Sequence, residues 1–247
     1  MRAPRPLPWL EPGEAFPDPL AAWAQGDPIP GLLAAGGALD TASLLTAYRH
    51  GIFPWFSQGQ PILWWSPDPR MVLRTADFKL HPSLRKTLRS ALKHGRLDIR
   101  IDSAFERVIE ACAHTPRKGQ NGTWILPDMV RAYVNLHRQG HAHSVETWWD
   151  GELVGGLYCV NVGHMVYGES MFSLRTDASK MALAALVAFC RFHDLPAIDC
   201  QQNTTHLASL GAREMPRDAF VQLVHRASVP PAPAWKWQPL YWSDWLS

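Results

Sequence analysis

The sequence predicts an α+β protein with a small N-terminal domain over residues 1–75, a larger domain over residues 76–233 and a C-terminal tail over residues 234–247. The first part is rich in Pro and Trp, which excludes a long helix and disfavours central strands. From residue 97 onwards, segments whose apolar residues recur at the period of a strand alternate with segments at the period of a helix. Three strand-like runs come in direct succession, joined by short turns, which indicates a sheet.

The N-terminal domain is expected to contain one short helix. Residues 1–39 are interpreted as an irregular surface segment. Asp40 is a favourable N-cap for a helix over Thr41–His50, and Gly51 is well placed to end it. Residues 51–70 contain GIFPWF and LWWSPDPR and are interpreted as a rigid aromatic loop. Its rings either fill a small hydrophobic core or present a flat platform for a base or an apolar side chain.

The stretch His81–His94 has the spacing of an amphipathic helix with leucines on one face. The opposite side carries a basic cluster, Arg85, Lys86, Arg89 and Lys93. Like charges at helical spacing repel weakly, and no Glu at that spacing compensates them. A solvated helix face is one interpretation. The uncompensated charge favours the other, a surface that binds nucleic-acid phosphates.

The larger domain is expected to alternate short strands and helices with clear end signals. Pro127 and Gly140 bracket one helix, Asp150-Gly151 is typical of a hairpin turn, and Asp177 is a favourable N-cap. The predicted elements are, in order, strand Leu97–Ile101, helices Phe105–Cys112 and Asp128–Gln139, strands Ala142–Trp149, Leu153–Val160 and Met165–Phe172, helix Ala178–His193, strand Pro196–Gln201 and helix Phe220–Arg226.

Composition and absent motifs exclude several classes of protein. The 247 residues include 24 Lys+Arg and 22 Asp+Glu, which is an ordinary globular balance. The apolar stretch Met181–Cys190 is too short to span a bilayer, and the N-terminus lacks a signal-peptide pattern, so a cytoplasmic protein is expected. The four cysteines lack CxxC spacing and are expected to be buried, reduced thiols. No GxSxG, HExxH, P-loop or GxGxxG motif occurs, and His141 with His143 lacks a second ligand pair, so neither metal nor cofactor is expected.

Three polar residues in apolar strands are candidates for chemistry. Strand alternation predicts that Asp199 and Gln201 share one face while Cys200 points to the other. A carboxylate beside an amide is either a hydrogen-bonded structural pair or a group that orients or deprotonates an attacking amine. Cys200 with His206 is a second candidate, a thiol nucleophile, although a buried Cys is usually a small apolar residue. Glu169 either binds a cationic group or pairs with an Arg.

Several short sequence motifs closely resemble those of the bacterial leucyl/phenylalanyl-tRNA–protein transferases. The resemblance covers roughly residues 30 to 225, in family order. The motifs on which the resemblance rests are GIFPWF, LWWSPDPR, GTWI at residues 122–125, GHAHSVE at 140–146, GESMFS at 168–173, DASK at 177–180, IDCQ at 198–201 and LASLGA at 207–212.

The resemblance implies an enzyme that moves Leu or Phe, and less readily Met, from aminoacyl-tRNA to the N-terminal Arg or Lys of a protein. It implies that acceptors are thereby marked for N-degron degradation. It also implies a small N-terminal domain followed by a GNAT-like, acetyltransferase-related mixed-sheet domain that needs neither metal nor coenzyme. We expect a monomer whose partners are aminoacyl-tRNA and the acceptor protein.

The resemblance also assigns roles to residues. The family's proton-relay carboxylate and partner amide fall on Asp199 and Gln201, and its acidic site residue falls on Glu169. The tryptophans near the terminal adenosine fall on Trp55 and Trp124. The basic helix for the acceptor stem corresponds, by position and charge, to Arg85, Lys86 and Arg89, with Lys93 on the same side.

Specificity for Leu and Phe requires an apolar pocket. Leu157, Met171, Leu186 and Ile198 are the candidates to line it, in the strands and helix around Glu169 and Asp199. Because aminoacyl-tRNA is already an activated ester, positioning and one proton path suffice. Asp199 either relays that proton or only holds groups while the terminal ribose assists. A non-catalytic RNA-binding module and a Cys200-dependent acyltransferase are the rival functions.

Overall fold

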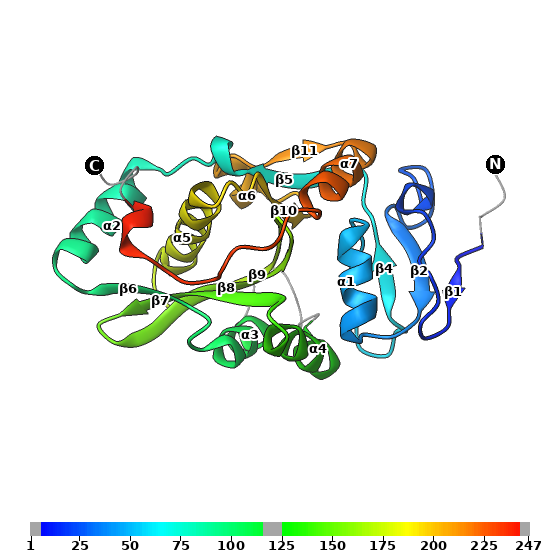
Figure 1. Cartoon of the computed structure of the whole chain (residues 1–247), viewed down its shortest axis with the longest axis horizontal. Coiled ribbons are helices and arrows are strands. Elements are labelled where there is room, and N and C mark those ends of the chain that lie inside the picture. The colour runs from blue at the N-terminus through cyan, green and yellow to red at the C-terminus, as the bar shows by residue number, and fades with distance from the viewer. Residues whose placement is uncertain (1–5, 116–124, 243–247) are drawn as a thin grey trace.

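The computed structural model describes residues 6–115 and 125–242, which form two sheets with flanking helices (Figure 1). The smaller sheet has the strand order β1-β2-β4-β3. Its helix α1, Thr41–Arg49, begins where predicted, because the Asp40 carboxylate accepts the Ser43 N–H at 3.0 Å. The strands are β1 (Trp9–Leu10), β2 (Leu32–Gly36), β3 (Phe53–Pro54) and β4 (Leu63–Trp65).

This sheet corrects two predictions. Residues 1–39 are not wholly irregular, because they contain β1 and β2, and residues 51–70 are not one loop, because they contain β3 and β4. The prolines do not prevent pairing, since Pro54 lies on the edge strand β3. Trp64 is fully buried, and its indole N–H donates to the Gly36 carbonyl at 2.9 Å. Of the two interpretations of the aromatic rings, core filling is confirmed for Trp64.

The larger sheet has seven strands in the order β11-β5-β10-β9-β8-β7-β6. Only β9 and β10 pair in parallel, and all other neighbours are antiparallel. This mixed sheet confirms the predicted α+β class. The strands are β5 (Arg70–Arg74), β6 (Leu97–Ile101), β7 (Ala142–Trp149), β8 (Glu152–Val162), β9 (Met165–Ser173), β10 (Ala197–Gln201) and β11 (Arg213–Met215).

Helices cover both faces of this sheet (Figure 1). Side chains of one face of β7 and β8 pack with α3 and α4, and those of the other face pack with α2 and α5. The adjacent Trp148 and Trp149 of β7 therefore belong to different layers. The helices are α2 (Pro82–Lys93), α3 (Phe105–His114), α4 (Pro127–Arg138), α5 (Ala178–Phe192), α6 (Thr205–Ser209) and α7 (Arg217–Ala227).

The elements predicted between residues 81 and 226 are confirmed to within a few residues at their ends. Among the strands of the larger sheet and the α-helices around it, β5, α6 and β11 were not predicted. The domain boundary near residue 75 stays a prediction. The pairing of β5 with β10 and β11 favours a division before residue 70, because these hydrogen bonds belong to the larger sheet.

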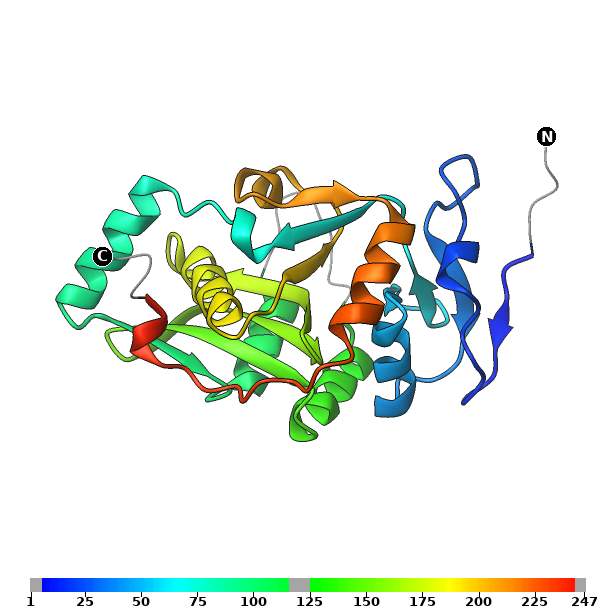
Figure 2. The ribbon, with the colours of Figure 1, turned by 45° about the horizontal axis from the view of Figure 1, so that its top comes forward.

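The C-terminal segment runs from α7 back across the larger sheet (Figure 2). The ring of Trp235 stacks on His143 with the centroids 4.1 Å apart, and its indole N–H donates to Asn161 at 3.1 Å. The short 3-10 helix Pro239–Trp242 packs against α5. No helix in residues 6–115 or 125–242 is long and apolar enough to cross a membrane.

Candidate active site

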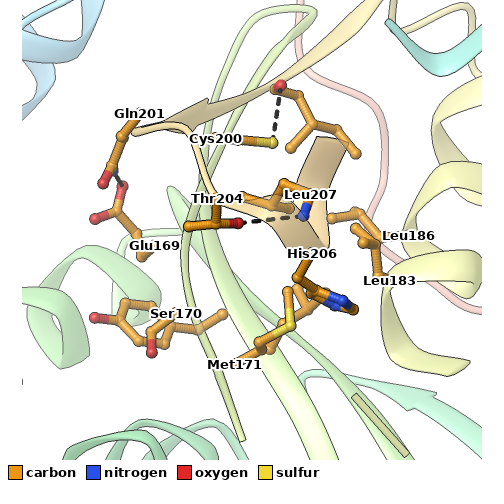
Figure 3. Close-up of a pocket in the computed structure, with 14 residues that line it drawn as sticks. Glu169, Ser170, Met171, Leu183, Leu186, Cys200, Gln201, Thr204, His206 and Leu207 are labelled. Carbon is orange, nitrogen blue, oxygen red and sulfur yellow. Dashed lines mark hydrogen bonds between the residues drawn. The ribbon is translucent and has the colours of Figure 1, made fainter. Parts of the chain in front are cut away.

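A pocket of about 270 Å³ lies where β8, β9, β10, α5 and α6 meet. One side is apolar and the other polar, and Figure 3 shows Leu183 and Leu186 opposite the hydrogen-bonded pair of Glu169 and Gln201. The lining residues are Leu157, Tyr158, Gly168, Glu169, Ser170, Met171, Leu183, Leu186, Ile198, Cys200, Gln201, Thr204, His206 and Leu207.

The structure brings together the four residues that sequence reasoning offered for an apolar pocket. Leu157, Met171, Leu186 and Ile198 all line it. Leu183 was missed, although it lies one helical turn before Leu186 on the same face of α5, a spacing that could have revealed it. That these residues hold a substrate side chain stays a prediction.

Asp199 lies beside the pocket but does not line it. Its side chain is fully buried and forms a two-pronged ion pair with Arg70, with Nε to Oδ1 at 2.8 Å and Nη2 to Oδ2 at 2.6 Å. The backbone N–H of Gln201 also donates to Oδ1, at 2.9 Å. Both oxygens of the carboxylate are therefore occupied by protein donors.

Arg70 is held as firmly as its partner. The guanidinium lies between the rings of Phe53 and Phe220, at 4.6 and 4.5 Å from their centroids, and Nη1 donates to the Gly51 carbonyl at 3.1 Å. Arg70 is fully buried. It thus ties the end of α1 to the strand that carries Asp199. Arg70 is the last residue of the LWWSPDPR motif, yet nothing in the sequence indicated that it is the partner of Asp199.

The prediction that Asp199 and Gln201 share one face of β10 is confirmed. Asp199 pairs with Arg70 and the Gln201 amide bonds to Glu169, both on the side of the sheet that packs with α1, whereas Cys200 packs with α5 on the other side. The register of β10 with β5 shifts between these residues, and Gln201 has a φ of 61°, in the left-handed region. These two features mark a sharp turn of the backbone at the end of β10. Cys200 and Gln201 both line the pocket, whereas Asp199 points to Arg70. The Asp199 carboxylate stabilises the turn through the Gln201 N–H.

Glu169 on β9 is the carboxylate that faces the pocket. It accepts hydrogen bonds from Tyr48 on α1 at 2.8 Å, from Tyr133 on α4 at 3.0 Å and from the Gln201 amide at 3.3 Å. Burial raises the pKa of Glu169 to about 7, although the hydroxyl donors oppose the shift. Glu169 therefore has no Arg partner among the described residues. Sequence reasoning missed both tyrosines.

The two tyrosines are part of the same buried layer. The hydroxyls of Tyr48 and Tyr133 lie 2.6 Å apart. Burial, reinforced by the charge of Glu169, raises the pKa of both tyrosines well above the usual range, so they remain neutral donors. Tyr167 on β9 donates its hydroxyl to the Tyr48 carbonyl at 2.6 Å, which anchors α1 to the larger sheet.

Cys200 lines the pocket but is poorly suited to act as a nucleophile. Burial raises the pKa of its thiol to about 12, so the thiolate is scarce at neutral pH. Its Sγ contacts the Ile198 carbonyl at 3.7 Å. Figure 3 shows the His206 ring directed away from Cys200. Burial, followed by the charge of Lys180, lowers the pKa of His206.

Comparison with known proteins identifies the family. The family model for leucyl/phenylalanyl-tRNA protein transferase matches residues 72–225, and the model for the N-terminal domain of that transferase matches residues 37–68. A leucyl/phenylalanyl-tRNA–protein transferase of a Polaromonas species is 61% identical over 246 residues, which cover 100% of this chain and 96% of the relative. That of Paraburkholderia xenovorans is 59% identical over 229 residues, covering 92% and 93%.

The chain belongs to the leucyl/phenylalanyl-tRNA protein transferase family. It is therefore an enzyme, an aminoacyltransferase.

Solved structures resemble this transferase only weakly. The C-terminal domain of a putative lysylphosphatidylglycerol synthetase from Agrobacterium fabrum has a TM-score of 0.40 and 12% identity, covering 79% of this chain and 70% of that one. A GCN5-related N-acetyltransferase from Kribbella flavida has a TM-score of 0.31 and 11% identity, covering 68% and 57%. Likenesses of this size support no inference about activity.

The remaining predicted site residues that the structure describes are not among those that line the pocket. Trp55 is half-buried, packs against Trp65 with the ring centroids 5.5 Å apart, and is not among the residues that line the pocket. Trp124 falls outside the described residues. The basic cluster of α2 is exposed on the solvent side of the helix: Arg85, Lys86, Arg89 and Lys93.

His141 and His143 do not form a metal site in the described part of the chain, where no three His, Cys, Asp or Glu side chains are grouped to hold an ion. The Nδ1 of His143 lies 2.7 Å from the Asp102 carboxylate. The four cysteines are free thiols. Three of them are buried, and Cys200 is partly exposed.

Proposed function

We propose that this enzyme transfers Leu or Phe, and less readily Met, from aminoacyl-tRNA to the N-terminal Arg or Lys of an acceptor protein. The new peptide bond then marks the acceptor for N-degron degradation. The observation that carries the proposal is the two-sided pocket, in which an apolar wall faces Glu169 and Gln201. In this proposal the enzyme works as a cytoplasmic monomer without metal or coenzyme.

The apolar wall receives the side chain of the donor amino acid. Leu157, Met171, Leu183, Leu186 and Ile198 offer it no hydrogen-bond partner, which disfavours polar amino acids. A flexible Met side chain tolerates occupants of different shapes. Because one methylene is worth only about 1–3 kcal/mol in such a pocket, overlapping use of Leu, Phe and Met is expected.

The polar wall receives the acceptor. The α-amine of a protein has a pKa of about 7.7–8.0, so a minority is neutral at pH 7. Ionised Glu169 attracts a cationic acceptor, and the Gln201 carboxamide orients the attacking nitrogen. The acid that favours a cationic N-terminal Arg or Lys is therefore Glu169 and not Asp199, whose charge is already matched by Arg70.

The chemical step needs no protein nucleophile. The acceptor nitrogen attacks the carbonyl carbon of the aminoacyl ester, the carbon–nitrogen bond forms and the bond to the ribose oxygen breaks. One proton leaves the nitrogen, and the departing ribose oxygen ends with a proton. Since both Asp199 oxygens accept donors from Arg70 and Gln201, we assign Asp199 to positioning Gln201. The activated ester supplies the driving force, and the pocket supplies orientation.

The donor RNA is proposed to bind on the side of α2. Arg85, Lys86, Arg89 and Lys93 form an exposed basic surface suited to the phosphates of the acceptor stem. Trp55 and Trp124 are assigned by resemblance to the terminal adenosine.

The test is to mix the enzyme with labelled leucyl-tRNA and matched peptides that begin with Arg, Lys or Ala. Label is expected on the first two peptides and not on the third. Transfer to the Ala peptide at an equal rate would overturn the acceptor assignment. Free leucine with ATP serving as donor would overturn the donor assignment.

A further inference from the structure

Two adjacent tryptophans end strand β7, and each carries two stacked arginines. The guanidinium of Arg175 lies 4.1 Å and that of Arg96 5.1 Å from the ring centroid of Trp149. On the opposite face of the sheet, Arg100 lies 4.2 Å and Arg107 5.3 Å from the ring of Trp148. The arginine–tryptophan chemistry is the same on both faces, but only one face carries α2 and α5.

The Trp149 face connects to the basic helix. A surface groove of about 530 Å³ is lined by residues of α2 together with the strand end, among them Lys86, His94, Arg96 and Trp149. Lys86 belongs to the basic cluster proposed to bind the acceptor stem. The positive surface of α2 therefore continues along the groove to Arg96 and Trp149, and Arg175 lies over the same Trp149 ring.

The same face connects to the pocket. Arg175 lies in the turn between β9, whose Met171 lines the pocket, and α5, whose Leu183 and Leu186 line it. Lys180, in the first turn of α5, acts electrostatically on His206, which also lines the pocket. Cationic groups thus follow one another from α2 through Arg96 and Arg175 to the pocket rim.

We propose that Arg96 and Arg175, stacked on Trp149, bind the phosphates of the single-stranded 3′ end of the donor tRNA between the acceptor stem and the pocket. This inference rests on the proposed function, and it gives the RNA a route that α2 alone does not supply. A guanidinium that stacks its face on a ring keeps its N–H edge for a phosphate.

Charges around this route indicate which arginine contributes most. Asp150 pairs with Arg96 at 2.5 Å, and Asp177 pairs with Lys180 at 2.7 Å, so two of the cations are partly neutralised. Arg175 is exposed and forms no ion pair within the described part of the chain, although its charge helps to lower the pKa of Asp150. The largest share of the phosphate attraction is therefore assigned to Arg175.

The test compares Arg175→Ala with Arg107→Ala. Both arginines are exposed, both stack on a β7 tryptophan, and Arg107 lies on the face away from the route. We expect Arg175→Ala to raise the KM for leucyl-tRNA about fivefold with kcat unchanged. It should also reduce the slope of log affinity against log salt by about 0.7, as for one single-strand phosphate. Arg107→Ala should change neither, and equal effects of the two variants would overturn the proposal.

A second donor separates this proposal from the function on which it rests. Leucyl-CCA trinucleotide has the 3′ phosphates but no acceptor stem. Arg175→Ala should raise the KM for both donors, whereas an Arg85→Ala/Arg89→Ala variant should raise it only for full tRNA. If wild-type enzyme transfers from leucyl-tRNA but Arg175→Ala leaves the KM for the trinucleotide unchanged, the route is wrong and the function stands. If wild type transfers from neither donor, the function itself fails.

Discussion

Two buried carboxylates bond to Gln201, and they have partners of different kinds. Asp199 faces a guanidinium that takes both of its oxygens, and it has no contact with the pocket. Glu169 faces the hydroxyls of two tyrosines, lines the pocket and has its pKa raised to about 7. Both are bonded to the same residue, since Asp199 holds the Gln201 backbone and Glu169 holds its side chain.

The difference separates a structural charge from a chemical one. A carboxylate that is saturated by a buried guanidinium is fixed in charge and in place. A carboxylate held only by neutral donors in an apolar setting changes its protonation near neutral pH. We therefore expect Asp199 to fix geometry and Glu169 to respond to substrate and to pH. Substitutions at Asp199, Glu169, Tyr133 and Cys200 test this division of roles.

The largest effect is expected from Asp199→Ala. This variant leaves the Arg70 guanidinium buried without its partner, which costs about 3–5 kcal/mol of unfolding free energy. It also releases the left-handed turn at Gln201, so transfer should fall by about 100-fold or more. Urea unfolding and a leucyl-transfer assay measure the two effects. This expectation differs from that of a purely catalytic acid, whose removal leaves folding unchanged.

The double variant Arg70→Met/Asp199→Leu is the control for that experiment. Replacing both members of a buried pair by apolar side chains restores much of the stability that one deletion loses. Transfer should nevertheless remain as low as in Asp199→Ala, because Gln201 is still released. A double variant that regains activity along with stability would show that the pair serves only folding.

The second prediction concerns Glu169→Gln and pH. Because the pKa of Glu169 is raised from 4.5 to about 7 in the fold, the folded state binds this proton more tightly than the unfolded state. Wild-type stability should therefore fall as pH rises from 4.5 to 7, by about 3 kcal/mol. Glu169→Gln should lack this loss in thermal unfolding curves recorded across that range.

The transfer rate should also depend on the ionisation of Glu169, but it should rise with pH where the stability falls. Transfer by the wild type to an Arg peptide should rise as pH increases through about 7, where Glu169 ionises. In Glu169→Gln the remaining pH dependence should be that of the peptide amine alone. A variant that keeps the wild-type profile would remove Glu169 from the chemistry.

The fold was largely predictable because its elements carry local signals. Asp40 caps α1, and Asp150-Gly151 forms a turn in which both residues have positive φ. The sequence did not reveal β5, because Arg70 was assigned to the aromatic loop and the next four residues carry no strand signal of their own. Its partners, β10 and β11, are far away in the chain. Short strands of this kind are specified by tertiary pairing rather than by local pattern.

The site was predictable only in part, for the same reason. The IDCQ and GESMFS motifs indicated Asp199, Gln201 and Glu169, but not the side chains that bond to the two carboxylates. Arg70 is 129 residues from Asp199 in the sequence, and Tyr48 is 121 residues from Glu169. Strand alternation placed Asp199 and Gln201 on one face correctly, but the register shift between them could not be read from an apolar pattern.

A smaller effect is expected from Tyr133→Phe. Its hydroxyl donates to Glu169, and loss of a donor to the charged form raises the pKa of Glu169 further. The rise of transfer with pH should therefore shift to higher pH, with a loss of about 1 kcal/mol in stability. Tyr167→Phe is the matched control, because it removes a buried hydroxyl bond to the Tyr48 carbonyl and leaves Glu169 untouched. Equal shifts in both variants would assign the effect to packing.

The smallest effect is expected from Cys200→Ala, which tests whether a third group in the pocket takes part. Desolvation raises the pKa of the Cys200 thiol to about 12, and the Sγ lies against the Ile198 carbonyl, so the thiol is neither ionised nor directed at a base. Transfer should stay within about twofold of wild type, and stability should fall by about 1 kcal/mol for the lost buried sulfur. Mass spectrometry of rapidly quenched reactions should show no leucyl thioester. A trapped thioester, or a Cys200→Ala variant without activity, would move the chemistry from Glu169 and Gln201 to sulfur and end the contrast between the two carboxylates.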